Sequence, residues 1–145
     1  MRSLLDVNVL IALMDADHVF HEKAHAWYGK NLSDGWSSCP ITENGLIRIT
    51  SHPNYHPTSP RRTEDVIRAL KTFKSTSDHQ FWPDSLSVTE ENTFHLGQIL
   101  GSKQLTDIYL LALATSHGGK LVTFDSSVNL AAVVASSPDN LCVFN

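Results

Sequence analysis

The chain contains few cysteines, no long apolar run and no excess of positive charge. Its two cysteines, Cys39 and Cys142, are too few for a disulfide scaffold and are not spaced like a zinc knuckle. The N-terminal apolar stretch at residues 7–14 is too short for a membrane span and lacks the pattern of a signal peptide. We therefore expect a cytoplasmic protein with no membrane partner, in which both cysteines are small buried hydrophobic residues.

The balance of charge is mildly acidic. Fifteen acidic and 11 basic residues give a net charge of −4, which argues against binding nucleic acid through positive charge spread over the whole surface. Hydrophobic residues at 41% and charged residues at 18% are ordinary for a globular chain and exclude wholesale disorder. The length of 145 residues and the lack of internal repeats predict a single domain over residues 1–145.

Short apolar segments alternate with helical patterns along the chain. The sequence predicts strands at residues 4–7, 80–82, 120–124 and 141–144, and a turn at residues 35–38 that enters a further short strand. It predicts helices at residues 9–13, 21–31, 42–52, 90–100 and 107–117, and a further helix that begins at Pro60. Strands separated by helices indicate an α/β fold, whose parallel sheet is covered on both faces and binds ligands at the carboxyl ends of its strands.

Capping residues and prolines mark the predicted boundaries. Thr42 and Thr106 are expected to be helix N-caps, and Gly101 is expected to close the helix that precedes it. Three prolines within residues 52–60 predict a loop, because proline propagates neither a helix nor a central strand.

Four carboxylates stand out by their position in this pattern. Asp6 and Asp125 end predicted strands, whereas Glu43 and Asp107 lie at helix starts. Each one alone has an ordinary structural explanation, as an N-cap or as a charge opposing a helix dipole. All four can nevertheless converge, because strand ends and the N-termini of the following helices point to the same edge of such a sheet.

Convergent carboxylates require a cation, since bare like charges in one site raise each other's pKa. Oxygen ligands suit the hard divalent ions Mg²⁺ and Mn²⁺. Such ions can deprotonate a water molecule and stabilise charge on a phosphodiester during in-line displacement. The pattern therefore predicts metal-dependent chemistry on a phosphate ester.

Four motifs, in order along the chain, resemble the PIN domain family. The residues LLDVNVLI at 4–11 resemble its opening, and ITENG at 41–45 resembles the segment with its conserved glutamate. LTDIYLLALA at 105–114 is similar to the helix that carries its third acid, and TFD at 123–125 matches its last acidic motif. The resemblance spans residues 3–144 and is strongest to the VapC toxins of bacterial type II toxin–antitoxin modules.

This resemblance implies a three-layer αβα sandwich with a mainly parallel central sheet. It implies an endoribonuclease in which one or two Mg²⁺ or Mn²⁺ ions are held by the four catalytic acids Asp6, Glu43, Asp107 and Asp125. Asn8 would orient Asp6 or a metal-bound water, and Thr123 would be a polar neighbour of Asp125. Metal-activated water would cleave a structured RNA to leave 5′-phosphate and 3′-hydroxyl ends, a cognate antitoxin would inhibit the enzyme, and the toxin would form a homodimer.

Basic residues gather in one segment. Five of the 11 lie between residues 61 and 74, which a solvated helix face would explain. Arg61 and Arg62, however, lie at a predicted helix N-terminus, the unfavourable end for cations. We therefore consider Arg61, Arg62 and Arg68 as contacts to RNA phosphate or to an acidic antitoxin segment. Arg48, one and a half turns after Glu43, is a second candidate for contacting the scissile phosphate.

Histidines and aromatic residues have weaker claims to a functional role. The pairs His21–His25 and His52–His56 have a spacing that suits zinc only on a helix with a third ligand, so surface or capping roles are favoured. Trp27 and Tyr28 are favoured as core residues over a platform for stacking bases.

Three other classes of protein compete with the nuclease hypothesis. Haloacid-dehalogenase-like enzymes also place an aspartate after the first strand, but require a second acid where this chain has Asn8. Receiver-type signalling domains require neighbouring acids before the first helix, and these are not evident. An inactive PIN fold that only binds RNA or a partner remains the alternative function, although all four acids are intact.

Overall fold

The computed structural model describes residues 1–144, without the side chain of Leu32. Five strands form one all-parallel sheet in the order β3-β2-β1-β4-β5. The strands are β1 (Ser3–Leu5), β2 (Trp36–Ser38), β3 (His79–Phe81), β4 (Lys120–Thr123) and β5 (Leu141–Val143). The helices are α1 (Val7–Met14), α2 (His21–Lys30), α3 (Pro40–Thr50), α4 (Thr63–Ser75) and α5 (Leu105–Ser116). The expected α/β class is confirmed.

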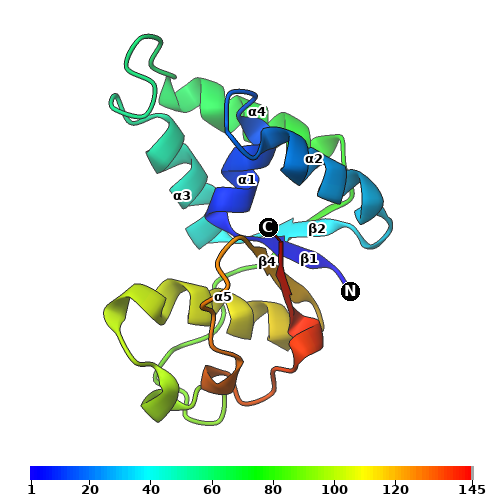
Figure 1. The fold of residues 1–145 in the computed structure, drawn as a ribbon, viewed down its shortest axis with the longest axis vertical. Helices are drawn as coiled ribbons and strands as arrows, with labels where there is room; N and C mark the ends of the chain where they lie inside the picture. Colours follow the sequence, from blue (N-terminus) through cyan, green and yellow to red (C-terminus); the bar gives the residue numbers. More distant parts are fainter. Residues whose placement is uncertain (145) are drawn as a thin grey trace.

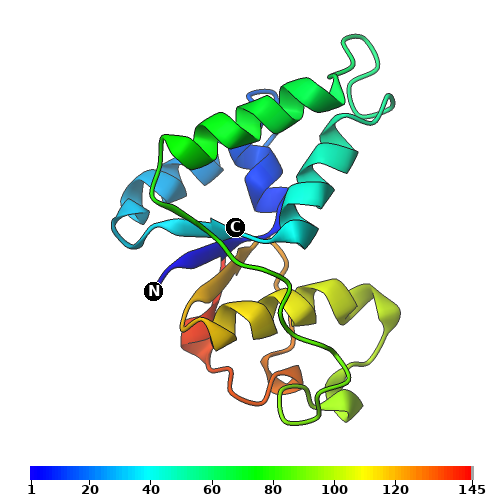
Figure 2. The same cartoon turned by 180° about the vertical axis from the view of Figure 1, so that it is seen from behind.

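The helices cover the sheet from both sides. Figures 1 and 2 show α1 to α4 on one side of the sheet and α5, with the segments that flank it, on the other. Neighbouring residues of β1 enter different cores: Leu4 packs on the α5 side and Leu5 on the side of α1 to α4. This alternation follows from the period of two along a strand, and it produces the predicted three-layer αβα sandwich.

One predicted helix is wrong. Residues 90–100 contain only turns and a short 3₁₀ helix at Leu96–Gln98. Only Phe94 is fully buried in this segment, where it forms an isolated antiparallel bridge with Val133. The segment therefore has no continuous apolar face to bury, and its Asn, Thr, His and Gly residues have poor helix propensity.

Several helices begin earlier or later than predicted. α3 begins at Pro40, with Cys39 as its N-cap, and Thr42 lies inside the helix and accepts from the Cys39 N–H at 3.0 Å. α5 begins at Leu105 rather than after Thr106, and α4 begins at Thr63 rather than at Pro60. Proline at the first position of α3 suits a helix start because its missing N–H would have no intrahelical acceptor.

Other expectations about packing are confirmed. Cys39 is buried, and Cys142 is half-buried against the core on the side of α1 to α4. Trp27 and Tyr28 pack against that same core, where Trp27 stacks on Phe144 with ring centroids 5.5 Å apart. None of the helices in residues 1–144 is long and apolar enough to cross a membrane.

The histidine pair on α2 caps a neighbouring helix. The rings of His21 and His25 bond to the carbonyl oxygens of Ala12 and Leu13, at 2.8 and 2.7 Å, in the last turn of α1. These carbonyls have no intrahelical partners, so the histidines satisfy them and tie α2 to α1. The capping role favoured from the sequence is confirmed.

Candidate active site

The carboxyl edge of the two central strands positions the first acid. Asp6 directly follows β1, is only 7% exposed and caps the N-terminus of α1. Its Oδ1 accepts the Val7 N–H at 2.7 Å, and its Oδ2 accepts the Thr123 hydroxyl at 2.8 Å. Thr123 reaches it because β4 pairs with β1 in parallel, with Val122 opposite Leu5. Asp6 is therefore held by two elements at once.

The hydroxyl of Thr123 links the first acid to the last. It donates to Asp6 and accepts the Asp125 N–H at 3.0 Å. The Asp125 Oδ1 in turn accepts the backbone N–H and the hydroxyl of Ser127, at 2.8 and 2.6 Å. These bonds from Ser127 lower the pKa of Asp125 and keep this exposed carboxyl ionised. The role of Thr123 as a polar neighbour now has a defined geometry.

The third acid lies in the first turn of α5, beside the other two. Burial, with the nearby charges of Asp6 and Asp125, raises the pKa of Asp107 to about 6. Burial also raises the pKa of Asp6, and the charge of Asp125 adds to this rise despite the hydrogen bonds from Thr123 and Val7. Asp107 and Asp125 line a cavity of about 330 Å³. Three of the four predicted acids therefore form one group of mutually repelling carboxyl groups, which we call the acid site.

The fourth predicted acid, Glu43, has different partners. It lies in the first turn of α3, where its Oε2 accepts the Lys74 ammonium at 2.8 Å and the Ser38 hydroxyl. Because the single hydroxyl proton of Ser38 goes to Glu43, the Nε2–H of His79 donates to Ser38 Oγ, at 2.8 Å. Within residues 1–144, no three Asp, Glu, His or Cys side chains are arranged so that they could hold a metal ion.

The remaining predicted contacts are mostly exposed. Asn8 lies on the exposed face of the first turn of α1, and Arg48 is exposed on α3. Arg62 and Arg68 both pair with Glu64, at 2.9 and 3.8 Å, and their side chains are more than 70% exposed. The roles of these residues toward RNA or an antitoxin stay predictions.

Arg61 differs from its neighbour Arg62, because it points into the protein. Its Nη2 lies 2.9 Å from the Asp15 Oδ1, and its guanidinium lies over the Tyr55 ring at 5.5 Å. The Tyr55 hydroxyl also donates to the Asp15 carboxylate, and the Asp17 N–H donates to the Oδ1 of Asp15 at 3.0 Å. We call Asp15, Tyr55 and Arg61 the Asp15 cluster.

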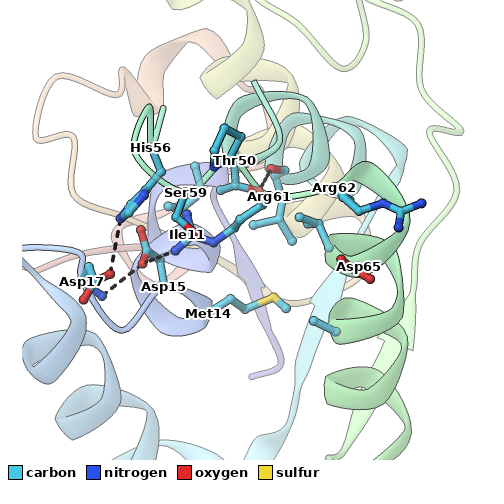
Figure 3. Close-up of a pocket in the computed structure, with 14 residues that line it drawn as sticks. Ile11, Met14, Asp15, Asp17, Thr50, His56, Ser59, Arg61, Arg62 and Asp65 are labelled. Carbon is cyan, nitrogen blue, oxygen red and sulfur yellow. Dashed lines mark hydrogen bonds and ion pairs between the residues drawn. The ribbon is translucent and has the colours of Figure 1, made fainter. Parts of the chain in front are cut away.

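Asp15 and Arg61 line a cavity of about 480 Å³ at the far end of α1 from Asp6 (Figure 3). Sequence analysis missed this cluster, although a signal was present. Asp15 lies at a helix C-terminus and Arg61 just before a helix N-terminus, and both ends are unfavourable for those charges. The ion pair between Asp15 and Arg61 explains why each charge lies at an unfavourable helix end.

Comparisons with known proteins agree with this architecture. The PIN domain family matches residues 3–134, and the chain belongs to that family. It is 44% identical over 141 residues to ribonuclease VapC44 of Mycobacterium tuberculosis, an alignment that covers 97% of this chain and 98% of the relative. The chain is thus a homologue of the VapC ribonuclease toxins.

Solved structures show the same fold. The crystal structure of VapC20 of Mycobacterium tuberculosis, a toxin that cleaves the sarcin–ricin loop, matches with a TM-score of 0.59 and 12% identity. That match covers 94% of this chain and 99% of the other. A chain of VapBC2 from Rickettsia felis, bound to a DNA fragment from the promoter, matches with a TM-score of 0.53 and 17% identity, over 100% of this chain and 98% of the other.

Proposed function

We propose that this protein is the toxin of a VapBC-type toxin–antitoxin pair and a Mg²⁺- or Mn²⁺-dependent endoribonuclease that cleaves structured RNA. The observation that carries the proposal is the acid site: Asp6, Asp107 and Asp125 come from three elements, meet at the carboxyl edge of the sheet and repel one another. Proteins tolerate such uncompensated charge chiefly where function requires it. The similarity to ribonuclease VapC44 over almost the whole chain supports the same class of reaction.

The donor chemistry of the acid site fits a hard divalent cation. Carboxylate oxygens are the preferred ligands of Mg²⁺ and Mn²⁺, and a cation would relieve the repulsion that raises the pKa of Asp107. Asp6, Asp107 and Asp125 would hold the ion and Glu43 would join them once these side chains close around it, because no three carboxylates of the described residues are already arranged as ligands of one ion. When bound, such an ion supplies an activated water and positive charge for the phosphodiester.

The chain itself contributes preorganisation. Thr123 and the start of α1 fix the orientation of Asp6, while Ser127 fixes that of Asp125. The orientation of these two carboxylates is therefore fixed before the substrate arrives. Asn8 is one residue beyond the Asp6–Val7 cap, on the exposed side of the first turn, where it can orient Asp6 or a water.

Exposed cations would contact the partners. Arg48, Arg62 and Arg68 have exposed side chains that can reach RNA phosphates or an acidic stretch of an antitoxin. The net charge of −4 is no obstacle to this, because the four proposed ligands carry all of it and the remaining residues sum to zero. We also propose that the toxin forms a homodimer and acts in the cytoplasm on cellular RNA.

The test is cleavage of total RNA by the purified protein with Mg²⁺ or Mn²⁺, with and without chelator. We expect chelator to abolish cleavage, and Asp6→Asn or Asp107→Asn to lower the rate by at least about 100-fold. Asp139→Asn is the matched control, since Asp139 is an exposed carboxylate in a distant turn. Mapping of the new 5′ ends then identifies the target and the cleaved bond.

Two outcomes would contradict the proposal. Equal cleavage by the wild type and both acid-site variants, or cleavage unaffected by chelator, would exclude a metal nuclease built on these acids. If neither the wild type nor any variant cleaves RNA, but calorimetry detects Mn²⁺ binding that Asp6→Asn removes, the protein is an inactive PIN fold that binds RNA or a partner.

A further inference from the structure

Glu43 is the only one of the four acids that is paired with a cation within residues 1–144. The Lys74 ammonium lies 2.8 Å from its Oε2, and the two side chains are only 28% and 17% exposed. No ion pair joins Asp6, Asp107 or Asp125 to a lysine, arginine or histidine of the described chain. The charge of Lys74 is thus directed at one acid while the other three stay uncompensated.

The position of Lys74 is supported from several sides. It lies in the last turn of α4, and its ammonium also lies over the ring of Phe81, 5.3 Å from the centroid. The Glu43 carboxylate also accepts the hydroxyl of Ser38, which is itself bonded to His79. Lys74 and Ser38 therefore both donate to the same oxygen, Oε2.

The ion pair lies in the wall of an open cavity. A hollow of about 370 Å³ between α3 and α4 is lined by Glu43, Ile47, Ile67, Leu70, Lys71, Lys74 and Ser75. Ions or substrate can therefore reach Glu43 from solvent. An incoming divalent cation and the Lys74 ammonium would compete for the same carboxylate oxygens, because both are cations that bind there by charge.

We propose that Lys74 is a built-in counter-ion for Glu43, which must release this carboxylate before Glu43 can join a divalent cation at the acid site. This inference rests on the proposed function. Lys74 is a positioning residue in this account, because it acts through Glu43. Its presence lowers the affinity of the protein for the metal, since part of the binding free energy is used to break the ion pair.

The test measures Mn²⁺ affinity by isothermal titration calorimetry, in the absence of RNA, for the wild type and for Lys74→Met. We expect Lys74→Met to bind Mn²⁺ about fivefold more tightly, the upper end of the range for exposed ion pairs, because this pair is mostly buried. Lys74→Arg, which keeps the charge, should restore an affinity close to that of the wild type.

Lys71→Met is the matched control. Lys71 lines the same cavity one turn earlier on α4 but forms no ion pair within residues 1–144. Its removal changes the net charge by the same amount, so it measures the general effect of losing one positive charge, which we expect to be about twofold or less. Thermal unfolding of each variant without metal shows whether a change in Mn²⁺ affinity arises from loss of folding. Lys74→Gln removes the same charge with a polar side chain, so it serves as a second variant if Lys74→Met does not fold.

The results separate this inference from the proposed function. If the wild type binds no Mn²⁺, or Asp6→Asn binds it equally well, both are overturned. If the wild type binds Mn²⁺ and Asp6→Asn does not, but Lys74→Met binds no more tightly than Lys71→Met, only the counter-ion role is overturned. Weaker Mn²⁺ binding by a folded Lys74→Met would also overturn it, because Lys74 would then assist the metal.

Discussion

The two ends of α1 carry aspartates that are equally buried and electrostatically opposite. Asp6 caps the N-terminus and is 7% exposed, and Asp15 caps the C-terminus and is 6% exposed. At the N-terminal end the pKa of Asp6 is raised, by burial and by the charge of Asp125. At the other end, the pKa of Asp15 is lowered, although burial opposes this, because Tyr55, the Asp17 N–H, Arg61 and His18 all favour its charge.

Burial therefore raises the pKa of Asp6, whereas at Asp15 the neighbouring donors and cations outweigh burial. The helix dipole would predict the reverse, since it favours an anion at the N-terminus and disfavours one at the C-terminus. At Asp15, the hydroxyl of Tyr55 and the guanidinium of Arg61 outweigh the dipole. Figure 3 shows Arg61 beside Asp15. The Asp15 cluster joins distant segments and stabilises the fold, whereas the acid site keeps its charge unpaired and available for a ligand.

The largest effect on stability is expected at the Asp15 cluster. Asp15→Ala leaves Arg61 and the Tyr55 hydroxyl without their acceptor, so the free energy of unfolding should fall by about 3 kcal/mol. Urea denaturation measures this. Asp17→Ala is the control, since Asp17 is exposed and pairs with His56 at 3.6 Å, and it should change stability by less than about 0.5 kcal/mol. Equal stabilities for Asp15→Ala and Asp17→Ala would show that the cluster does not stabilise the fold.

A change of the opposite sign is expected at the acid site. Asp107→Asn removes a charge that Asp6 and Asp125 repel, and without metal it should raise the free energy of unfolding by about 1–2 kcal/mol. The measurement is thermal unfolding in chelator at pH 7.5, beside Asp139→Asn. Destabilisation by Asp107→Asn would mean that the charge is compensated and that the comparison between the two ends of α1 fails.

The sequence predicted the fold well where local rules decide the structure. The residues Leu4 and Leu5 mark a strand buried on both faces, and seven apolar residues in a row predicted the buried α5. The helix predicted at residues 90–100 fails because only Phe94 is buried there, and its contact with Val133 is too distant in sequence to be inferred. Helix starts were also displaced, because capping groups such as Cys39 have no strong signal in the sequence.

The acids of the acid site were predicted from one topological rule and from a family resemblance. The ion pairs that the structure shows at Glu43 and at the Asp15 cluster were not predicted. Strand ends placed Asp6 and Asp125, and the first turn of a helix placed Asp107. The contact of Arg61 with Asp15, 46 residues away, was not predicted because it depends on tertiary structure, and the role of Arg61 toward RNA or an antitoxin stays a prediction. The same holds for Lys74 and Glu43, which are 31 residues apart and come together only through the packing of α3 and α4.

A change of pH should have a smaller effect on the free energy of unfolding than these substitutions. The pKa of Asp107 is raised to about 6 in the folded state, against an ordinary value of 3.8, so the folded state binds this proton more tightly than the unfolded state. The resulting stabilisation is present below pH 4 and is lost as the pH rises through 6. In chelator, the wild type should therefore lose about 1 kcal/mol more than Asp107→Asn between pH 5 and 7.5. Parallel pH profiles of the two proteins would contradict this account.

The smallest effect on stability is expected at the exposed arginines next to the Asp15 cluster. Arg62 and Arg68 share Glu64 on the solvent side of α4, so Arg62→Ala together with Arg68→Ala should change the free energy of unfolding by less than about 0.5 kcal/mol. The same double variant should weaken RNA cleavage, because it removes two exposed cations that can reach phosphates. Arg61→Ala should have the opposite balance of effects, because it breaks the contact with Asp15 and so lowers the free energy of unfolding more than the double variant does. Cleavage unchanged by the double variant would show that α4 is only a solvated face, and that the cations for RNA lie elsewhere.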